Sequence, residues 1–382
     1  MLTFDSKPIM MVKRALFYFL CMLAIGVHAQ NTGAPVLNIG DPAPPLYVEE
    51  WVKGAPIQQM EKGRIYVVEF WATWCKPCRA AMPHLSALAR QYKDEITVVG
   101  VDVLEQENTP VERIRAFVDN MGKKMDYHVA IDAGNRMEEE WFNAAHGDGA
   151  GIPRSFVVDG DGRLAWIGHP SGLDEVIRKM VDGDWDIDQA LADRNEARRL
   201  YELDNDLLFR LRYPPDYGKR GYVERPDSLL SVIAEIVEEE PKLRYAYSIT
   251  YHTFKTLLKT DQVKAHQYGE EVLAAAEEPP YEAIFSTIRD YPEQSELIPE
   301  IYLLGAEAYQ HRIDHLIYPE IADLTYDYNQ MAEWYWQAGR QREAIAAQKK
   351  AVKALKRRTR VSATDLAEPR ARLQSYKKTE SR

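Results

Sequence analysis

Cysteine is scarce in this sequence, with 3 residues among 382: Cys21, Cys75 and Cys78. So few cysteines exclude the disulfide framework that stabilises many small secreted domains. They also argue against a zinc site, because Cys75 and Cys78 would need two further ligands at similar spacing. The sequence offers no second cysteine pair and no nearby histidine pair. We therefore predict no bound metal and no cofactor.

An excess of positive charge is also missing. The chain carries 48 Lys and Arg residues against 59 Asp and Glu residues, which gives a formal net charge of −11. This balance argues against a nucleic-acid partner, which would require clustered positive charge. Hydrophobic residues at 46% and charged residues at 28% are ordinary values for a globular protein. The length favours two domains over one.

The most apolar stretch, ALFYFLCMLAIGV, is too short to cross a bilayer comfortably. Lys13 and Arg14 precede it, and VHAQ follows it, with Val27 and Ala29 at the small-residue positions of a signal-peptidase site. We therefore expect residues 1–29 to be a signal peptide that directs the protein to the periplasm or another exported location. The alternatives are a membrane anchor that is retained and a buried N-terminal helix.

Residues 30–183 are predicted to form an α/β domain. RIYVVEFWA and ITVVGVDV are apolar runs typical of buried parallel strands. Between them, CRAAMPHLSALARQY has helical spacing. After the second run, TPVERIRAFVDNMG predicts a helix with Thr109 as N-cap and Pro110 at its first position. RSFVVDGDGRLAWIGH predicts a hairpin, and SGLDEVIRKMVDG a closing helix. Strands are also expected on either side of the turn at Lys53 and Gly54.

From residue 187 onward only helical patterns are identified, which predicts an all-α domain over 187–370 and a tail over 371–382. In this region PDSLLSVIAEIVEEEP is expected to be capped by Asp227. Near the end, small and aromatic residues have the spacing of a tetratricopeptide helix pair: Ala332, Tyr335, Gly339, Ala344 and Ala351. No second repeat of similar quality is identified, so an ordinary helical hairpin remains the alternative.

The stretch FWATWCKPC resembles the active site of the thioredoxin superfamily, and within it that of the TlpA/ResA-like exported disulfide reductases. The resemblance covers about residues 36–182 and implies nothing about the helical region. GIPRSFVVDGDGRL resembles the loop and hairpin that carry the family's cis-proline. The residues that match in order are Glu69, Trp71, Trp74, Cys75, Cys78, Pro83 and Pro153.

A dithiol with two intervening residues suits thiol–disulfide exchange better than structural cross-linking, because so short a loop constrains the unfolded chain little. Exchange needs a thiolate that attacks and a second thiol that resolves the mixed disulfide. Cys75, at the N-terminus of a helix and beside Lys76, is expected to be the attacker, and Cys78 the resolver. Trp74 is expected to shield the Cys75 sulfur, and Trp71 to be a packing residue.

Glu69 interrupts an apolar strand, and the pattern alone allows either a buried base or a side chain that reaches solvent. The resemblance implies a base that takes the proton from Cys78 and whose pKa burial raises toward neutrality. The resemblance also implies a cis peptide bond at Pro153, which would present the Ile152 backbone to a substrate strand beside the cysteines.

The leading hypothesis is an exported protein-disulfide oxidoreductase that reduces or exchanges disulfides in other exported proteins. Its partners would be protein thiols and disulfides, an unidentified electron-donor protein and a protein that binds the helical domain. One alternative is a thiol peroxidase on the same fold, although Thr73 is one residue too close to Cys75 for a peroxidatic motif and the expected proline is missing. The other is a scaffold with a vestigial redox unit. Two histidines in HRIDH, His311 and His315, are interpreted as a solvated helix face.

Overall fold

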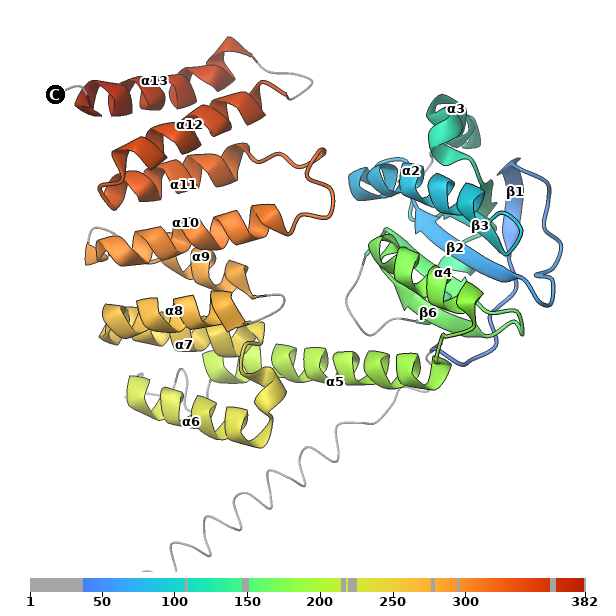
Figure 1. Cartoon of the computed structure of the whole chain (residues 1–382), viewed down its shortest axis with the longest axis horizontal. Helices are drawn as coiled ribbons and strands as arrows, with labels where there is room; N and C mark the ends of the chain where they lie inside the picture. Colours follow the sequence, from blue (N-terminus) through green and yellow to red (C-terminus); the bar gives the residue numbers. More distant parts are fainter. Residues whose placement is uncertain are drawn as a thin grey trace, which may run out of the picture.

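The computed structural model consists of an α/β unit and a stack of helices, joined by the long helix α5 (Figure 1). It describes residues 37–106, 109–145, 151–213, 218, 225–275, 279–293, 296–357 and 362–380. The expected signal peptide at 1–29, with Cys21, lies outside these residues. In the part of the chain that the structure describes, no helix combines the length and apolar character needed to cross a membrane.

The α/β unit contains one mixed sheet with the strand order β1-β4-β3-β2-β5-β6. Its strands are β1 (Val48–Lys53), β2 (Ile65–Trp71), β3 (Ile96–Asp102), β4 (His128–Asp132), β5 (Arg154–Val158) and β6 (Leu164–Gly168). β2, β3 and β4 run parallel, whereas β1, β5 and β6 pair antiparallel with their neighbours. β1 ends at Lys53 as expected, but no strand follows the turn at Gly54 until β2 begins.

β2 lies between β3 and β5, and helices cover both faces of the sheet at this strand. The helical elements of the unit are α2 (Lys76–Gln91), α3 (Val111–Met121), α4 (Leu173–Asp182) and the π-helix η2 (Glu138–Asn143). Successive side chains of a strand point to opposite faces, so Val67 packs with α2, α3 and α4, whereas Val68 packs with η2 and the start of α5. Burial on both faces explains the nearly continuous apolar run of β2.

Two helix starts differ from the expectation. Pro110, at φ −68° and ψ 141°, is extended and is the N-cap of α3, so Thr109 lies one residue too early to be the cap. The helix that begins at Pro226 has Arg225 as its N-cap, and Asp227 lies in the first turn. There the Asp227 carboxylate can interact favourably with the helix dipole but does not cap the helix. Pro110 precedes the first residue of its helix, and Pro226 is the first residue of its helix. In both helices the N-cap is therefore a different residue from the one expected.

The second unit is helical throughout its described residues. Its helices are α5 (Ile187–Arg212), α6 (Pro226–Glu239), α7 (Tyr247–Thr260), α8 (Gln262–Ala275), α9 (Tyr281–Arg289), α10 (Pro299–Asp314), α11 (Thr325–Gln337), α12 (Gln341–Leu355) and α13 (Ala363–Glu380). Neighbouring helices stack side by side in Figure 1. The predicted fold class, an α/β thioredoxin-like domain followed by an all-α domain, is confirmed. The short α9 was not anticipated, and α13 extends into residues 371–380, which were assigned to a tail.

The expected repeat-like hairpin is formed by α11 and α12. Ala332, Ala344 and Ala351 are fully buried, and Gly339, with φ +73°, lies in the connection between the two helices. Their small side chains permit close packing of the two helices. The tetratricopeptide-like character of the hairpin stays a prediction.

α5 contacts both units of the molecule. Ile187, Ala190 and Leu191 near its start pack on the core of the α/β unit. Leu203 and Leu207 further along pack in a cluster with residues of the helical unit. The predicted domain boundary between 183 and 187 therefore lies just before a helix whose first turns pack on the α/β unit.

Candidate active site

The two cysteines lie where β2 is followed by α2, and they form a disulfide. Cys75 is the N-cap of α2, and its sulfur accepts a hydrogen bond of 3.2 Å from the backbone N–H of Cys78. Pro77 lies in the first turn of the helix and no acidic residue does, so the helix start is favourable for negative charge. In this disulfide form both cysteines are nearly inaccessible, with exposed fractions of 2% and 1%. In this state the two cysteines therefore do not differ in exposure.

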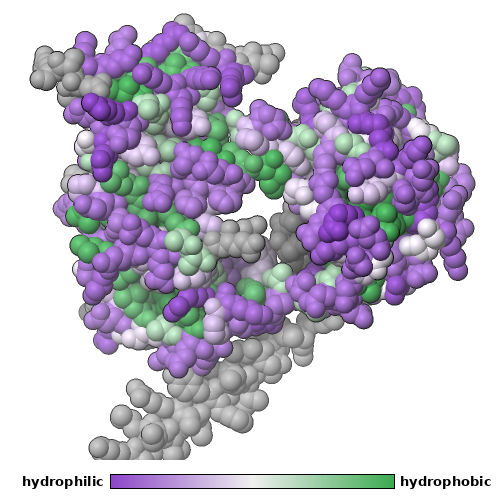
Figure 2. All heavy atoms as spheres, in the orientation of Figure 1, coloured by the Kyte–Doolittle hydropathy of each residue, from purple (hydrophilic) through white to green (hydrophobic). Residues whose placement is uncertain are grey.

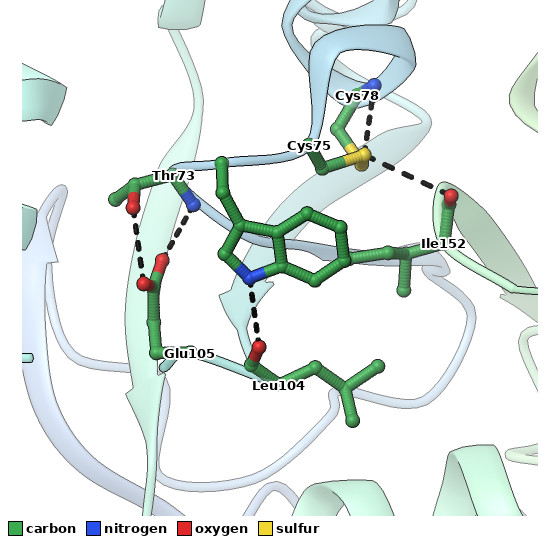
Figure 3. Close-up of a disulfide and its surroundings, with 7 residues drawn as sticks. Thr73, Cys75, Cys78, Leu104, Glu105 and Ile152 are labelled. Atoms are coloured by element: carbon green, nitrogen blue, oxygen red, sulfur yellow. Dashed lines mark hydrogen bonds between the residues drawn. A yellow bond between two sulfur atoms is a disulfide. The ribbon is translucent and has the colours of Figure 1, made fainter. Parts of the chain in front are cut away.

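The loop before β5 reaches the same place. The peptide bond between Ile152 and Pro153 is cis, as the resemblance implies. The carbonyl oxygen of Ile152 lies 3.7 Å from the sulfur of Cys75 (Figure 3). Two segments far apart in the sequence thus bring a reactive sulfur and a backbone acceptor together.

Trp74 is a large hydrophobic residue that is exposed next to the disulfide, at 48%. Its indole N–H donates a hydrogen bond of 2.8 Å to the carbonyl oxygen of Leu104, in the loop after β3. Leu104 has φ 57°, a left-handed conformation that is uncommon for a leucine. The indole is thereby held at the surface next to Cys75, whereas Trp71 is buried and stacks on Phe117 as a packing residue.

The turn before Cys75 is fixed by Glu105, a residue that the sequence analysis missed. Its carboxylate accepts hydrogen bonds from the backbone N–H of Thr73, at 2.5 Å, and from the Thr73 hydroxyl, at 3.0 Å (Figure 3). Burial and then the nearby Glu105 carboxylate raise the pKa of Asp102 to about 9. The sequence signal that could have identified Glu105 is the pair of acidic residues in VDVLEQ. This segment ends β3, and the parallel strand β2 ends at the same edge of the sheet, so residues that follow the two strands can meet.

Glu69 lies in the interior, 1% exposed, between Gly100 of β3 and Ser155 of β5. The alternative that its side chain reaches solvent is therefore wrong. Burial raises the pKa of Glu69 to about 8, although a hydrogen bond from the Ser155 hydroxyl acts in the opposite direction. A carboxyl group with such a pKa can both hold and release a proton near neutral pH.

The helical unit approaches this region through the loop between α10 and α11. The ring of Tyr318 in this loop lies 5.8 Å from the ring of His169, which follows β6. Burial, and then the charge of Glu69, raise the pKa of Tyr318 to about 12. Burial lowers the pKa of His169. The ring contact between Tyr318 and His169 shows that this loop lies against the α/β unit.

The histidines assigned no role in the sequence analysis show no sign of metal binding. The rings of His311 and His315 are stacked 5.9 Å apart, and Nδ1 of His315 is 2.7 Å from the carbonyl oxygen of His311. Among the described residues, no group of three or more His, Cys, Asp or Glu residues is arranged to hold a metal ion. His146, which the sequence places shortly before Pro153, lies outside the described residues.

A disulfide at the N-terminus of a helix, facing the carbonyl before a cis-proline at the edge of a mixed sheet, defines a thioredoxin-fold redox site. The family model described as AhpC/TSA family matches residues 39–167. The chain is 34% identical over 160 residues to Protein FixW of Rhizobium leguminosarum, which covers 40% of this chain and 70% of FixW. It is 34% identical over 151 residues to the thiol:disulfide interchange protein HelX of Rhodobacter capsulatus, 39% of this chain and 77% of HelX.

A crystal structure of a thioredoxin-family thiol:disulfide interchange protein from Chlorobium tepidum is 25% identical and has a TM-score of 0.29, covering 37% of this chain and 96% of that chain. On the sequence similarities, the chain belongs to the TlpA/ResA-like thiol–disulfide oxidoreductases of the thioredoxin superfamily. It is accordingly an oxidoreductase of thiols and disulfides, and it contains a Cys75–Cys78 disulfide. The family model ends at residue 167, so the helical unit lies outside it.

Proposed function

We propose that this protein is an exported oxidoreductase that reduces or exchanges disulfides in other exported proteins. The observation that carries the proposal is the Cys75–Cys78 disulfide at the start of α2, with the Ile152 carbonyl 3.7 Å from the Cys75 sulfur. The thiol–disulfide chemistry of the relatives supports the reaction class. The export pattern at 1–29 supports the location.

In the reducing direction, the Cys75 thiolate attacks one sulfur of a client disulfide. A bond forms between the Cys75 sulfur and that client sulfur, and the second client sulfur leaves as a thiolate that takes up a proton. The Cys78 thiolate then attacks the Cys75 sulfur, which regenerates the Cys75–Cys78 disulfide and releases the first client sulfur as a thiol. The client gains two electrons, and a reductant of the dithiol or protein-thiol class must return them to the cysteine pair.

Glu69 is proposed to accept the proton of Cys78 before the second attack. Its burial beneath α2 and its pKa of about 8 support this role, because a base of that strength can remove a thiol proton near neutral pH. Pro153 is proposed to shape the loop that presents Ile152 to the client backbone, and Trp74 to form an exposed wall of the same surface. These roles together would align the client sulfur with Cys75.

The test is reduction of a generic protein disulfide by the full-length protein, with Cys78→Ser as a variant that should accumulate mixed disulfide. We expect turnover by the parent protein and covalent trapping by the variant. Consumption of peroxide in clear preference to disulfides would instead support the thiol peroxidase. A parent protein without any turnover would support the scaffold with a vestigial redox unit. Cleavage after Ala29 is checked by determining the N-terminus of the exported protein.

A further inference from the structure

A groove lies between α2 of the catalytic unit and the helical unit, where α12 and the loop between α10 and α11 face α2 (Figure 1). Its volume is about 1040 Å³. Lys76, the residue that follows Cys75 in the chain, is one of its lining residues, whereas neither cysteine lines it. In Figure 2 hydrophilic atoms border the space between the two units, together with a hydrophobic patch on the helical unit where it approaches the α/β unit.

Positive charge dominates this groove, although the chain as a whole carries a net charge of −11. Its acidic lining residues are Glu320 and Asp323. Its basic lining residues, all exposed, are Lys76, Arg79, Lys124, Lys350, Lys353 and Arg357. The six come from both units of the molecule. Such a concentration within an acidic protein creates a local field of opposite sign to the net charge.

These cations are not neutralised by the protein itself. Within the described ranges, none of the six makes an ion pair with a carboxylate. Arg79 instead lies 5.7 Å from the ring of Phe117, and Lys350 lies 5.3 Å from the ring of Tyr328. Aromatic rings orient cationic groups without cancelling their charge. The groove is therefore prepared for an anionic occupant.

The two walls of the groove are connected to each other at two places. α5 packs on the catalytic core through Ile187 and Leu191 and joins the helical unit through Leu207. At the other place, Tyr318 contacts His169. A groove supported in this way offers a defined spacing between its walls, which suits recognition of an extended chain.

We propose that the groove binds an acidic segment of the client polypeptide, next to the cysteine that Cys75 attacks. The inference rests on the proposed function and adds a preference among clients. Charge complementarity selects an acidic segment. A polypeptide fits better than a small anion, because apolar side chains also line the groove, among them Pro83, Ile321 and Leu324. The helical domain would then contribute to client choice directly at the catalytic centre.

The test uses the full-length protein and three disulfide-linked peptides of equal length, whose cysteine is flanked by four Glu, four Gln or four Lys residues. The rate constant of reduction is measured at low salt and in 0.5 M NaCl. We expect the Glu peptide to react about tenfold faster than the Gln peptide at low salt and the Lys peptide to be slowest. Salt should largely remove these differences, because exposed charges are screened.

The variant Lys350→Glu/Lys353→Glu reverses two groove charges on α12. Its matched control, Lys349→Glu/Lys356→Glu, makes the same change in net charge at exposed positions of α12 and its end that do not line the groove. We expect the first variant to lose the preference for the Glu peptide and the control to keep at least half of it. The control should reduce the Gln peptide at the parent rate, because it changes neither the groove nor the cysteines.

Equal rates for the three peptides, or equal losses in both variants, would overturn the proposal while leaving disulfide reduction established. Failure to reduce any of the peptides would overturn the proposed function and this inference with it. Sedimentation of the parent and the groove variant tests a second copy of the chain as occupant. A dimer that dissociates in Lys350→Glu/Lys353→Glu, with no advantage for the Glu peptide, would contradict the proposal.

Discussion

The hydroxyl of Ser155 in β5 donates a hydrogen bond to the buried carboxyl group of Glu69 in β2, its direct partner across two antiparallel strands. This hydrogen bond favours the ionised form of Glu69, whereas burial favours the protonated form. Burial has the larger effect, and the pKa of about 8 is the result. The pair therefore sets the pH range in which Glu69 can accept a proton.

Replacing Glu69 by Gln should slow release of the mixed disulfide near neutral pH, because the base proposed for Cys78 is lost. A decrease of about a hundredfold to ten-thousandfold is expected for loss of a general base. The measurement is single-turnover release across pH 6–8. Ser155→Ala serves as the matched variant, since it retains the carboxyl group but raises its pKa, and it should shift the pH profile upward. Parent-like release by Glu69→Gln over this range would rule out the proton-transfer role.

The buried carboxyl group of Glu69 should also make stability depend on pH. Its pKa is about 8 in the folded protein and 4.5 in a solvated reference, so between these values the folded state holds a proton that the unfolded chain has released. The free energy of unfolding should therefore fall as the pH rises through this window, by up to about 5 kcal/mol. Urea unfolding at pH 5 and pH 8 measures the effect. In Glu69→Gln the free energy of unfolding should differ less between pH 5 and pH 8, because the contribution of this carboxyl group is absent.

The sequence was informative where a local pattern determines the structure. The apolar runs of β2 and β3 and the dithiol at the start of α2 depend on residues close together in the chain. Glu69 was identified as a candidate because it interrupts an apolar strand, but its burial follows from β3, β5 and α2 packing around it. The two helix caps were misplaced because prolines at Pro110 and Pro226 allow more than one start within a residue or two.

Contacts between distant segments could not be predicted in the same way. Glu105 fixes Thr73 only because β2 and β3 end side by side, and Tyr318 reaches His169 only because α5 positions the helical unit. No periodicity or motif in one segment contains that information. The basic groove likewise combines residues of α2 and α12, whose separate charges resemble ordinary solvated helix faces in the sequence.

In the reduced protein the thiol of Cys75 should have a pKa below the value of about 8.5 for a free cysteine. The N-terminus of α2, the Cys78 N–H at 3.2 Å from the Cys75 sulfur and the neighbouring Lys76 all favour the thiolate. We expect these effects on the Cys75 thiolate to exceed the opposing effect of burial. Alkylation rate against pH, with the modified residue identified by mass spectrometry, measures it. Faster alkylation of Cys78 would contradict the assignment of attacker and resolver.

Removing the carboxylate that holds the turn before Cys75 should weaken the fold locally. Glu105→Ala leaves the Thr73 N–H and hydroxyl without their charged acceptor, which should lower the free energy of unfolding by about 1 to 3 kcal/mol. Glu112→Ala in α3, at an exposed position, is the control and should change stability by about 0.5 kcal/mol or less. Glu105→Gln should also lower the pKa of Asp102, because a nearby negative charge is removed. Unchanged stability in Glu105→Ala would show that the hydrogen bonds to Thr73 are not needed.

The catalytic unit should be chemically competent without the helical domain, provided that the first turns of α5 are kept. A fragment of residues 30–183 lacks Ile187, Ala190 and Leu191, which pack on the core of the α/β unit. Because these side chains are partly buried, extending the fragment to residue 198 should raise its free energy of unfolding by about 2 to 4 kcal/mol. The longer fragment also restores the hydrogen bond of 2.8 Å from Asn38 to Asn195.

Urea unfolding of the two fragments and reduction of a generic disulfide test this expectation. The longer fragment should reduce the substrate at a rate close to that of the full-length protein, because the cysteines, Glu69 and the Ile152 carbonyl all belong to it. Asn195→Ala in the longer fragment is a control that removes one hydrogen bond and retains the apolar contacts, so it should lose much less stability than truncation at 183. If the two fragments have the same free energy of unfolding, the start of α5 does not stabilise the α/β unit. If neither is active, the helices are required for catalysis, and their proposed role in client choice alone is wrong.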